Sequence, residues 1–151
     1  MNFKAFYREW VRAVSSAFYI GYIPAASGTF GSLAGLALAW YALPTAPYAF
    51  ILLSVLGISV CKAAEILYSR KDPSYFVMDE VCGMMLSVLW LPREIWIYVV
   101  AFILFRLLDI TKPWFIRTLQ NYSHPHSIMW DDLAAGFLTN IFVQILYHFL
   151  I

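Results

Sequence analysis

The sequence predicts an all-α membrane protein: a polytopic helical bundle of about five apolar helices, preceded by an amphipathic helix at the membrane surface. Hydrophobic residues make up 62% of the 151 residues and charged residues only 13%, about half of the charged fraction of a typical soluble domain. Apolar segments recur along the chain between short polar links. The length fits one domain, so residues 1–151 are expected to form a single membrane-embedded domain. The net charge of +1 argues against a nucleic-acid-binding protein, which carries a basic face.

Residues 1–20 are expected to form the surface helix. Apolar residues recur there at helical spacing, with basic residues between them; they are Phe3, Phe6, Tyr7, Trp10, Val11, Val14 and Phe18. This pattern is typical of a helix that lies in the membrane interface. The residues after Arg12 include two serines, a glycine and Pro24, which make a poor apolar region for a signal peptide. We therefore expect no cleaved signal peptide.

Five apolar segments follow the surface helix. They run from about Phe30 to Leu43, from Tyr48 to Tyr68, from Val77 to the LPRE stretch, from Ile95 to Asp109 and from Ile128 to Ile151. Several are shorter than the roughly 20 residues that a straight membrane span needs. Because the links are short, successive helices should alternate in direction.

The basic residues indicate an orientation for this bundle. With alternating helices, one side of the membrane receives Lys4, Arg8, Arg12, Arg70, Lys71, Arg106, Lys112 and Arg117. The other side receives only Arg93. The positive-inside rule then places the N-terminus in the cytoplasm and the C-terminus outside. This predicts a multi-pass protein of the cytoplasmic (inner) membrane.

The same arrangement gathers acidic residues at the cytoplasmic helix ends. Six of the nine fall there: Asp72, Asp79, Glu80, Asp109, Asp131 and Asp132. Ionised carboxylates at membrane depth are costly unless something compensates them. Magnesium takes hard oxygen ligands, usually a few carboxylates together with waters and phosphate oxygens. The sequence therefore predicts a Mg²⁺ site, with Asp79, Glu80, Asp109, Asp131 and Asp132 as candidate metal ligands and catalytic residues.

Four of these acids form two doublets, VMDE and MWDD, at the starts of the third and fifth apolar segments. Two adjacent residues cannot share one face of a helix. In each doublet, one acid could reach a metal while its neighbour orients a ligand, binds a second ion or activates water. The alternative is that the doublets only cap helix N-termini, where acidic residues are favoured.

The stretch FRLLDITKP carries charges that complement a phosphate. Arg106, Asp109 and Lys112 recur every three residues, so Arg106 and Asp109 should be neighbours on a helix that ends near Pro113. An arginine offers a planar fork to phosphate and a lysine a point charge. Arg106 and Lys112 are therefore candidate phosphate-binding residues. The alternative is a simple Arg106–Asp109 ion pair with an ordinary base beside it.

The stretch PAASGTFGSL precedes the first apolar segment and is rich in small residues. Free amides at a helix N-terminus, together with small residues that allow close approach, could form an anion cradle. Thr29, Gly31 and Ser32 are the candidate phosphate-binding residues here, although such a stretch can equally serve as a helix-packing contact.

Polar residues also lie inside two apolar segments. A stripe with a spacing of four runs along the last segment through Asp132, Gly136, Asn140, Gln144 and His148. We interpret it as interior hydrogen bonding between helices, with a proton or ion path as the alternative. Lys62 and Glu65, three residues apart in the second segment, are expected to form a compensated pair near the cytoplasmic end, with support of the acidic site as the alternative for Glu65.

Taken together, four stretches resemble the signature blocks of the phosphatidylglycerophosphatase A family of bacterial membrane enzymes, in order and in spacing. They are GYIPAASGTFGSL, KDPSYFVMDEVCG, FRLLDITKPWFI and IMWDDLAAGF, and the resemblance runs from about Gly21 to Phe137. The matching positions are Thr29, Gly31 and Ser32, Asp79 and Glu80, Arg106, Asp109, Lys112 and Pro113, and Asp131 and Asp132. The family usually has a glycine-rich run before the last block, where this chain has SHPHS and Pro125 should stiffen the segment.

The resemblance implies an enzyme. Members of the family remove the terminal phosphate from phosphatidylglycerophosphate, giving phosphatidylglycerol, and require magnesium. The expected partners are therefore a phospholipid substrate and the bacterial membrane, with Mg²⁺ as cofactor, no nucleic acid and the oligomeric state left open. The alternative is a small membrane ion or metal transporter that uses the acidic cluster.

Overall fold

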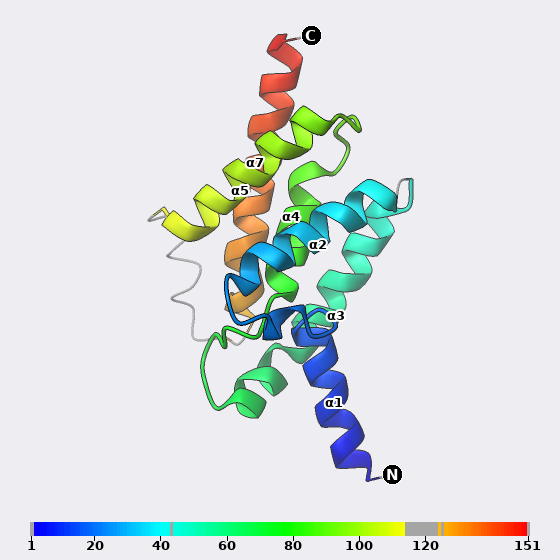
Figure 1. The fold of residues 1–151 in the computed structure, drawn as a ribbon, viewed down its shortest axis with the longest axis vertical. Coiled ribbons are helices and arrows are strands. Elements are labelled where there is room, and N and C mark those ends of the chain that lie inside the picture. The colour runs from blue at the N-terminus through cyan, green and yellow to red at the C-terminus, as the bar shows by residue number, and fades with distance from the viewer. Residues whose placement is uncertain (1, 43, 114–123, 125, 151) are drawn as a thin grey trace.

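The computed structural model describes residues 2–42, 44–113, 124 and 126–150. Its six described α-helices are α1 (Phe3–Ser15), α2 (Ser27–Tyr41), α3 (Ala46–Tyr68), α4 (Met78–Val88), α5 (Ile95–Thr111) and α7 (Ser127–Leu150). The described residues include no strand, and the expected all-α class is confirmed (Figure 1). Arg117 and Pro125, which entered the sequence analysis, lie outside the described residues.

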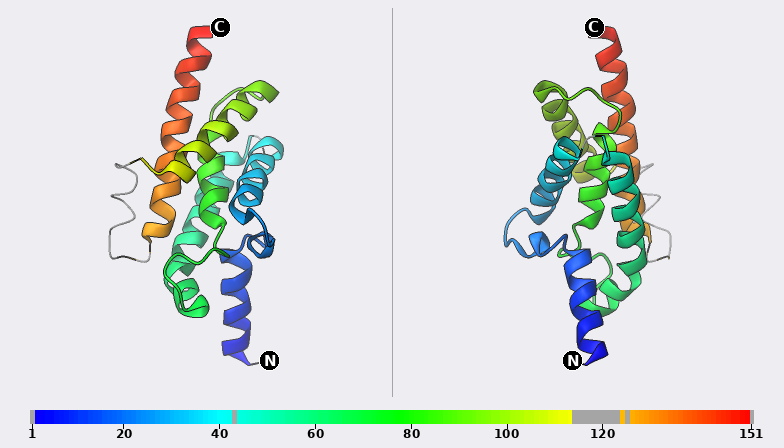
Figure 2. Two further views of the ribbon diagram at one scale, coloured as in Figure 1. Left: turned by 60° about the vertical axis from the view of Figure 1, so that its left-hand side comes forward. Right: turned by 90° about the vertical axis from the view of Figure 1, so that its right-hand side faces the viewer.

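The helices from α2 to α7 alternate in direction, as expected from their short links (Figures 1 and 2). The N-terminus and the C-terminus lie at opposite ends of the long axis. Helix α4 is the centre of the bundle, because α2, α3, α5 and α7 all pack against it. Nine of its 11 residues are buried, which explains how so short a helix is stabilised by its neighbours rather than by its own length.

Glycines set the closest helix crossings. A Cβ atom added to Gly136 of α7 would lie 2.2 Å from the carbonyl oxygen of Gly83 in α4. A Cβ added to Gly35 of α2 would lie 2.4 Å from the carbonyl oxygen of Val81. Small residues that let two backbones meet are the usual packing device of membrane helices. Helices α2 and α7 are therefore held tightly against α4.

The N-terminal helix is shorter than the sequence predicted. Helix α1 ends at Ser15, and the next residues include Ala17, Phe18 and Tyr19 with positive φ angles of 47°, 54° and 71°. The Ser16 hydroxyl stabilises this reversal, since it donates to the carbonyl of Arg12 and accepts from the amide of Tyr19. The chain then forms a short 3₁₀ turn, Ile20–Tyr22.

Helix α1 is amphipathic, and it packs against α3. Val11 and Val14 are buried on the packed side. The aromatic residues Phe3, Phe6 and Trp10 are exposed. The amphipathic pattern is thus present in the structure, while its position at a membrane surface stays a prediction.

Two of the described helices are long and apolar enough to cross a membrane, namely α3 with 23 residues and α7 with 24. Helices α2, α4 and α5 have 15, 11 and 17 residues. The expected set of five apolar helices is therefore not confirmed as five membrane spans. Of these shorter helices, only α4 is mostly buried by its neighbours, whereas α2 and α5 expose large apolar side chains such as Leu33 and Ile103.

The polar stripe of α7 bonds to α4 along part of its length. The Asn140 side-chain amide donates to the carbonyls of Ser87 and Leu89 at distances of 3.2 and 2.9 Å. Gln144 donates in turn to the Asn140 side chain, whereas His148 is exposed. The stripe therefore satisfies the carbonyl groups where α4 ends, as the hydrogen-bonding interpretation predicted.

Candidate active site

Three carboxylates meet where α4 and α7 begin. Asp79 and Glu80 lie in the first turn of α4, Asp132 lies in the second turn of α7, and one oxygen from each lies within 4.8 Å of the others. Asp79 is 6% exposed and Asp132 is 2% exposed. We call Asp79, Glu80 and Asp132 the carboxylate cluster.

The glycine crossing of α4 and α7 positions this cluster. Gly83 lies one turn after Asp79, and Gly136 lies one turn after Asp132. A Cβ atom at Gly83 would lie 2.6 Å from the carbonyl oxygen of Asp132 itself. Because the two backbones touch one turn beyond the acids, the short aspartate side chains can reach each other.

The cluster has the chemistry of a divalent-cation site. Two buried oxygens of the cluster, Glu80 Oε2 and Asp132 Oδ2, have no hydrogen-bond partner in the described structure, and neither has Oδ1 of the adjacent Asp131. Buried polar groups are almost always paired, and buried like charges repel each other. A hard divalent cation with oxygen ligands would satisfy both requirements. The donor set therefore fits Mg²⁺.

Basic side chains from α5 border the cluster. Arg106 Nη1 donates to Asp109 Oδ2 at 2.5 Å and to the Ser32 hydroxyl at 3.3 Å. Lys112 Nζ donates to Asp131 Oδ2 at 2.5 Å and lies 4.0 Å from Asp109 Oδ1. Asp109 thus lies between the two bases and orients both of them.

Lys112 stays charged in this environment. Burial by itself would lower the pKa of its amino group, but the hydrogen bond to Asp131 and the charges of Asp131, Asp132 and Asp109 outweigh burial and raise the pKa above its ordinary value. A lysine with a raised pKa contributes its stability at neutral pH and loses that contribution only when the pH rises through the raised value.

Comparison with known proteins places the chain in a family. The family model of phosphatidylglycerophosphatase A matches residues 13–147. The chain belongs to the phosphatidylglycerophosphatase A family. The resemblance seen in the sequence is thereby confirmed, and so is the expectation that the protein is a phosphatase.

Three curated relatives match over most of their length. The phosphatidylglycerophosphatase A of Escherichia coli is 34% identical over 126 residues, which cover 79% of this chain and 73% of the relative. That of Haemophilus influenzae is 28% identical over 148 residues, 93% and 91% of the two chains. A Bacteroides thetaiotaomicron protein provisionally named phosphatidylinositol-3-phosphatase is 30% identical over 145 residues, 87% and 90% of the two chains. No solved structure matches.

The four phosphatidylglycerophosphatase A blocks, which are far apart in sequence, meet at one place in the structure. Asp132 of the last block lies beside Asp79 and Glu80 of the second. Ser32 of the first block contacts Arg106 of the third. The Lys112–Asp131 pair joins the third block to the last. The acidic helix ends therefore converge as expected, with Asp72 exposed in the link before α4 but close enough for its charge to act on Asp131.

The doublets divide differently from the expectation. In the second doublet, Asp132 belongs to the carboxylate cluster while Asp131 pairs with Lys112. This agrees with the expectation that the two acids of a doublet have different roles. Asp79 and Glu80, however, both belong to the cluster. The reason is that α4 has neighbours on several sides, so two adjacent side chains can both point into the protein.

The small-residue stretch lies inside α2 rather than in a loop before it. Helix α2 begins at Ser27, so Thr29, Gly31 and Ser32 occupy its first two turns, with Thr29 half-buried and Ser32 buried. Gly31 packs against Val77, which favours the packing interpretation for that residue. Ser32 donates to a carbonyl of its own helix and accepts from Arg106.

Gly28 has a role that the sequence analysis did not assign. A Cβ atom there would lie 2.4 Å from Glu80 Oε1 and 3.4 Å from Arg106 Nη1. The missing side chain leaves room for these opposite charges to approach α2. Gly83 was also not identified, although Asp79 and Gly83 repeat the spacing of Asp132 and Gly136.

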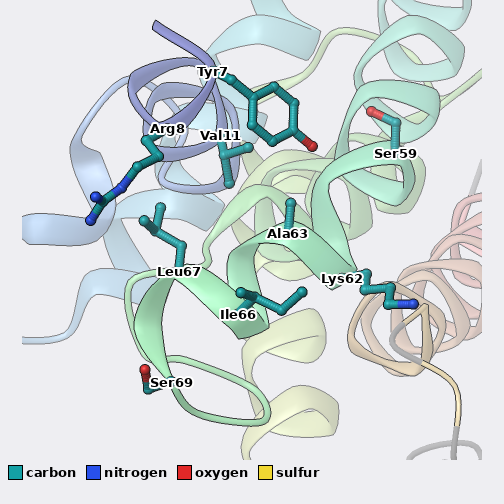
Figure 3. A pocket seen from close by; sticks show the side chains of 9 residues that line it. All are labelled: Tyr7, Arg8, Val11, Ser59, Lys62, Ala63, Ile66, Leu67 and Ser69. Carbon is teal, nitrogen blue, oxygen red and sulfur yellow. The ribbon is translucent and has the colours of Figure 1, made fainter. Parts of the chain in front are cut away.

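A separate groove lies between α1 and α3 (Figure 3). Its volume is about 720 Å³, and its lining shares no residue with the carboxylate cluster or with the bases of α5. Lys62, which was expected to pair with Glu65, lines this groove instead. Within the part of the chain that the structure describes, no salt bridge joins Lys62 to Glu65.

Proposed function

We propose that this protein is a Mg²⁺-dependent lipid phosphomonoesterase that hydrolyses phosphatidylglycerophosphate to phosphatidylglycerol and phosphate in phospholipid biosynthesis. The observation that carries this proposal is the carboxylate cluster with its unpartnered oxygens, bordered by Arg106 and Lys112. The family supplies the substrate class, since two relatives are named phosphatidylglycerophosphatase A.

Each residue of the site has a role in this proposal. Asp79, Glu80 and Asp132 would hold the metal ion, which supplies positive charge that polarises the phosphate ester. Arg106 and Lys112 would bind the phosphate oxygens and stabilise charge that spreads over the transferred group. Asp109 contacts both bases and Asp131 contacts Lys112, so these two acids position the phosphate-binding side chains.

The remaining candidates support this arrangement. Ser32 accepts a hydrogen bond from Arg106, and it would hold the guanidinium group toward the phosphate. Thr29 and Gly31 share the first turns of α2 with Ser32. The first amides of α2 and the Thr29 hydroxyl would contribute to phosphate binding, because amides at a helix N-terminus favour anions.

We place the protein in the bacterial inner membrane as a multi-pass protein, with the site on the cytoplasmic side. Two helices have the length and hydropathy of membrane spans, and the termini lie at opposite ends of the molecule. Arg93 is the base expected on the external side, and its Cζ atom lies 4.6 Å from the centre of the Trp40 ring. A cation stacked on a tryptophan ring is typical of a membrane interface. In this orientation the substrate's acyl chains stay in the bilayer while its phosphate meets the site.

The decisive experiment measures phosphate release from phosphatidylglycerophosphate by the purified full chain, with magnesium and with a chelator. We expect release only with magnesium, and a loss of about 10²–10³-fold in Asp132→Asn, the size of effect seen when one group that supports transition-state charge stabilisation is removed. Asp72→Asn is the matched control, because the same change is made at an exposed acid outside the cluster. Magnesium-independent release, or full activity in Asp132→Asn, would contradict the proposal.

The same assay with phosphatidylinositol 3-phosphate as substrate tests which head group the site accepts, because one relative is provisionally named a phosphatidylinositol-3-phosphatase.

A membrane transporter is the alternative class of protein. Its polar groups would lie along a path through the bilayer, whereas the Asn140 donors are occupied by carbonyls of α4. Metal flux into sealed vesicles without phosphate release would favour the transporter.

A further inference from the structure

The groove between α1 and α3 combines an apolar floor with basic and hydroxyl groups at its rim (Figure 3). Val11 of α1 and Ala63, Ile66 and Leu67 of α3 supply apolar surface. The polar groups are those of Tyr7, Arg8, Ser59, Lys62 and Ser69. Among the residues that the structure describes, no acidic residue lines the groove. A ligand with a hydrocarbon portion and a negative charge matches this lining.

Lys62 is the unusual member of this set. It lies inside α3, one of the two helices that could cross a membrane, and its side chain is exposed. In the described part of the chain it forms no salt bridge. A lysine at membrane depth is costly and is normally paired or functional.

Tyrosines indicate how deep Lys62 lies. Tyr68, the last residue of α3, joins a cluster in which its ring centre lies 6.5 Å from that of Tyr22 and 5.3 Å from that of Tyr75. Tyrosines gather at the level of lipid head groups. Lys62 is six residues earlier in the helix, about 9 Å along its axis at 1.5 Å per residue. From this depth, the long and flexible side chain of Lys62 can reach a lipid phosphate.

We propose that the α1–α3 groove binds an anionic phospholipid of the surrounding membrane, with its phosphate at Lys62 and an acyl chain over Ala63 and Ile66. The lipid compensates the lysine charge and fixes α1 against α3. This ligand is a phosphodiester and not the substrate, because the groove shares no residue with the carboxylate cluster or the α5 bases. The inference does not depend on the proposed phosphatase activity.

The test measures lipid retention by the purified full chain, using native mass spectrometry after equilibration with equal amounts of phosphatidylserine and phosphatidylcholine, because phosphatidylglycerol is the product of the proposed reaction. We expect the wild-type protein to retain phosphatidylserine preferentially. Lys62→Gln should reduce that preference about fivefold, a typical effect of one basic residue near a lipid surface. Lys71→Gln is the control, because Lys71 is exposed just after the same helix and does not line the groove. Equal retention of both lipids by the wild-type protein, or equal losses in the two variants, would overturn the proposal.

A second variant tests the apolar floor independently. Ala63→Trp fills the groove while every charge remains, and we expect it to reduce retention of both lipids. Unchanged lipid retention in Ala63→Trp would place the lipid elsewhere and overturn the proposal. Addition of inorganic phosphate should not displace the lipid, whereas efficient displacement would show that the groove binds a phosphate group alone and would also overturn it.

Discussion

Replacing Asp132 by asparagine should raise the melting temperature above that of the wild-type protein in the presence of a chelator, and lower it below that of the wild-type protein in saturating magnesium. The change keeps the shape of the side chain and removes one charge from three carboxylates whose nearest oxygens lie within 4.8 Å of one another. Without a metal ion, these charges repel each other in a site where Asp132 is only 2% exposed. The variant should therefore be more stable than the wild-type protein when a chelator is present.

The size of this effect follows from the geometry. Two unit charges 4.8 Å apart repel each other by about 3 kcal/mol at an effective dielectric constant of about 20, and the variant removes two such pairs. A buried asparagine amide without partners costs about 1–3 kcal/mol, and proton uptake by the wild-type cluster relieves part of the repulsion. We expect a net gain of about 2 kcal/mol, which is a rise of roughly 4–8 °C in melting temperature for a chain of this size.

Magnesium should have the opposite effect. A ligand that binds only the folded state stabilises it by about 2.7 kcal/mol at a hundred times its dissociation constant. The wild-type protein should gain this stability and Asp132→Asn should not, so the wild-type protein melts higher when magnesium is saturating. Thermal melts of detergent-purified protein with magnesium and with chelator measure all four values. Asp72→Asn should respond to magnesium as the wild-type protein does.

Two results would refute this reasoning. Equal melting temperatures of the wild-type protein with magnesium and with chelator would mean that the carboxylate cluster does not bind the ion. A full magnesium response in Asp132→Asn would mean that the ion binds elsewhere.

Further predictions concern the contacts around the site. Lys112→Met should lower the free energy of unfolding by about 3 kcal/mol, because it leaves the buried Asp131 without its partner; denaturant titration at about pH 9, where the raised pKa of Lys112 keeps the wild-type lysine charged, measures this loss, and an unchanged midpoint would contradict it. Asn140→Leu removes the donors to the Ser87 and Leu89 carbonyls without adding a charge and should cost about 1–3 kcal/mol in the same titration; an unchanged midpoint would show that these bonds contribute nothing. Gly136→Ala should lower the melting temperature, because its Cβ would lie 2.2 Å from the Gly83 carbonyl oxygen; an unchanged melting temperature would show that this contact does not hold α7 against α4. Gly28→Ala should reduce phosphate release while the protein stays folded, because its Cβ displaces the flexible end of Glu80; normal activity would argue against a role for Glu80.

Much of the fold could be predicted from the apolar segments and their breaks. The helices after α1 appear where the segments were expected, and they alternate in direction as the order of the segments predicted. The end of α1 was missed, because the left-handed residues after Ser15 are alanine, phenylalanine and tyrosine, which do not signal a reversal. The number of membrane spans could not be settled by composition, since a helix buried in protein is as apolar as one in lipid.

The sequence predicted which residues gather at the candidate site better than it predicted which of their side chains contact each other. The expected residues do gather, but their sequence spacing did not show that Asp131 would face Lys112 while Asp132 faces α4. A signal for this was present. Asp132 shares its face of α7 with Gly136 and Asn140, each four residues further on, and both contact α4. Asp131 lies about 100° away around the helix and therefore faces a different neighbour.

The same argument explains why the other doublet behaves differently. The face of α4 that carries Asp79 and Gly83 is turned to α7, as the contact between Gly83 and the Asp132 carbonyl shows. Glu80 is turned to α2, where Gly28 leaves room for its carboxylate. Both directions point into the protein because α4 is surrounded, and the longer glutamate side chain can bend back to the oxygens of Asp79 and Asp132. Sequence periodicity gives the angle between neighbouring side chains, but the number of faces that are buried depends on how many helices surround the segment. Both acids of the α7 doublet are buried as well, each 2% exposed, so the two doublets differ in what their side chains face: both acids of α4 reach the carboxylate cluster, whereas on α7 Asp132 reaches it and Asp131 pairs with Lys112.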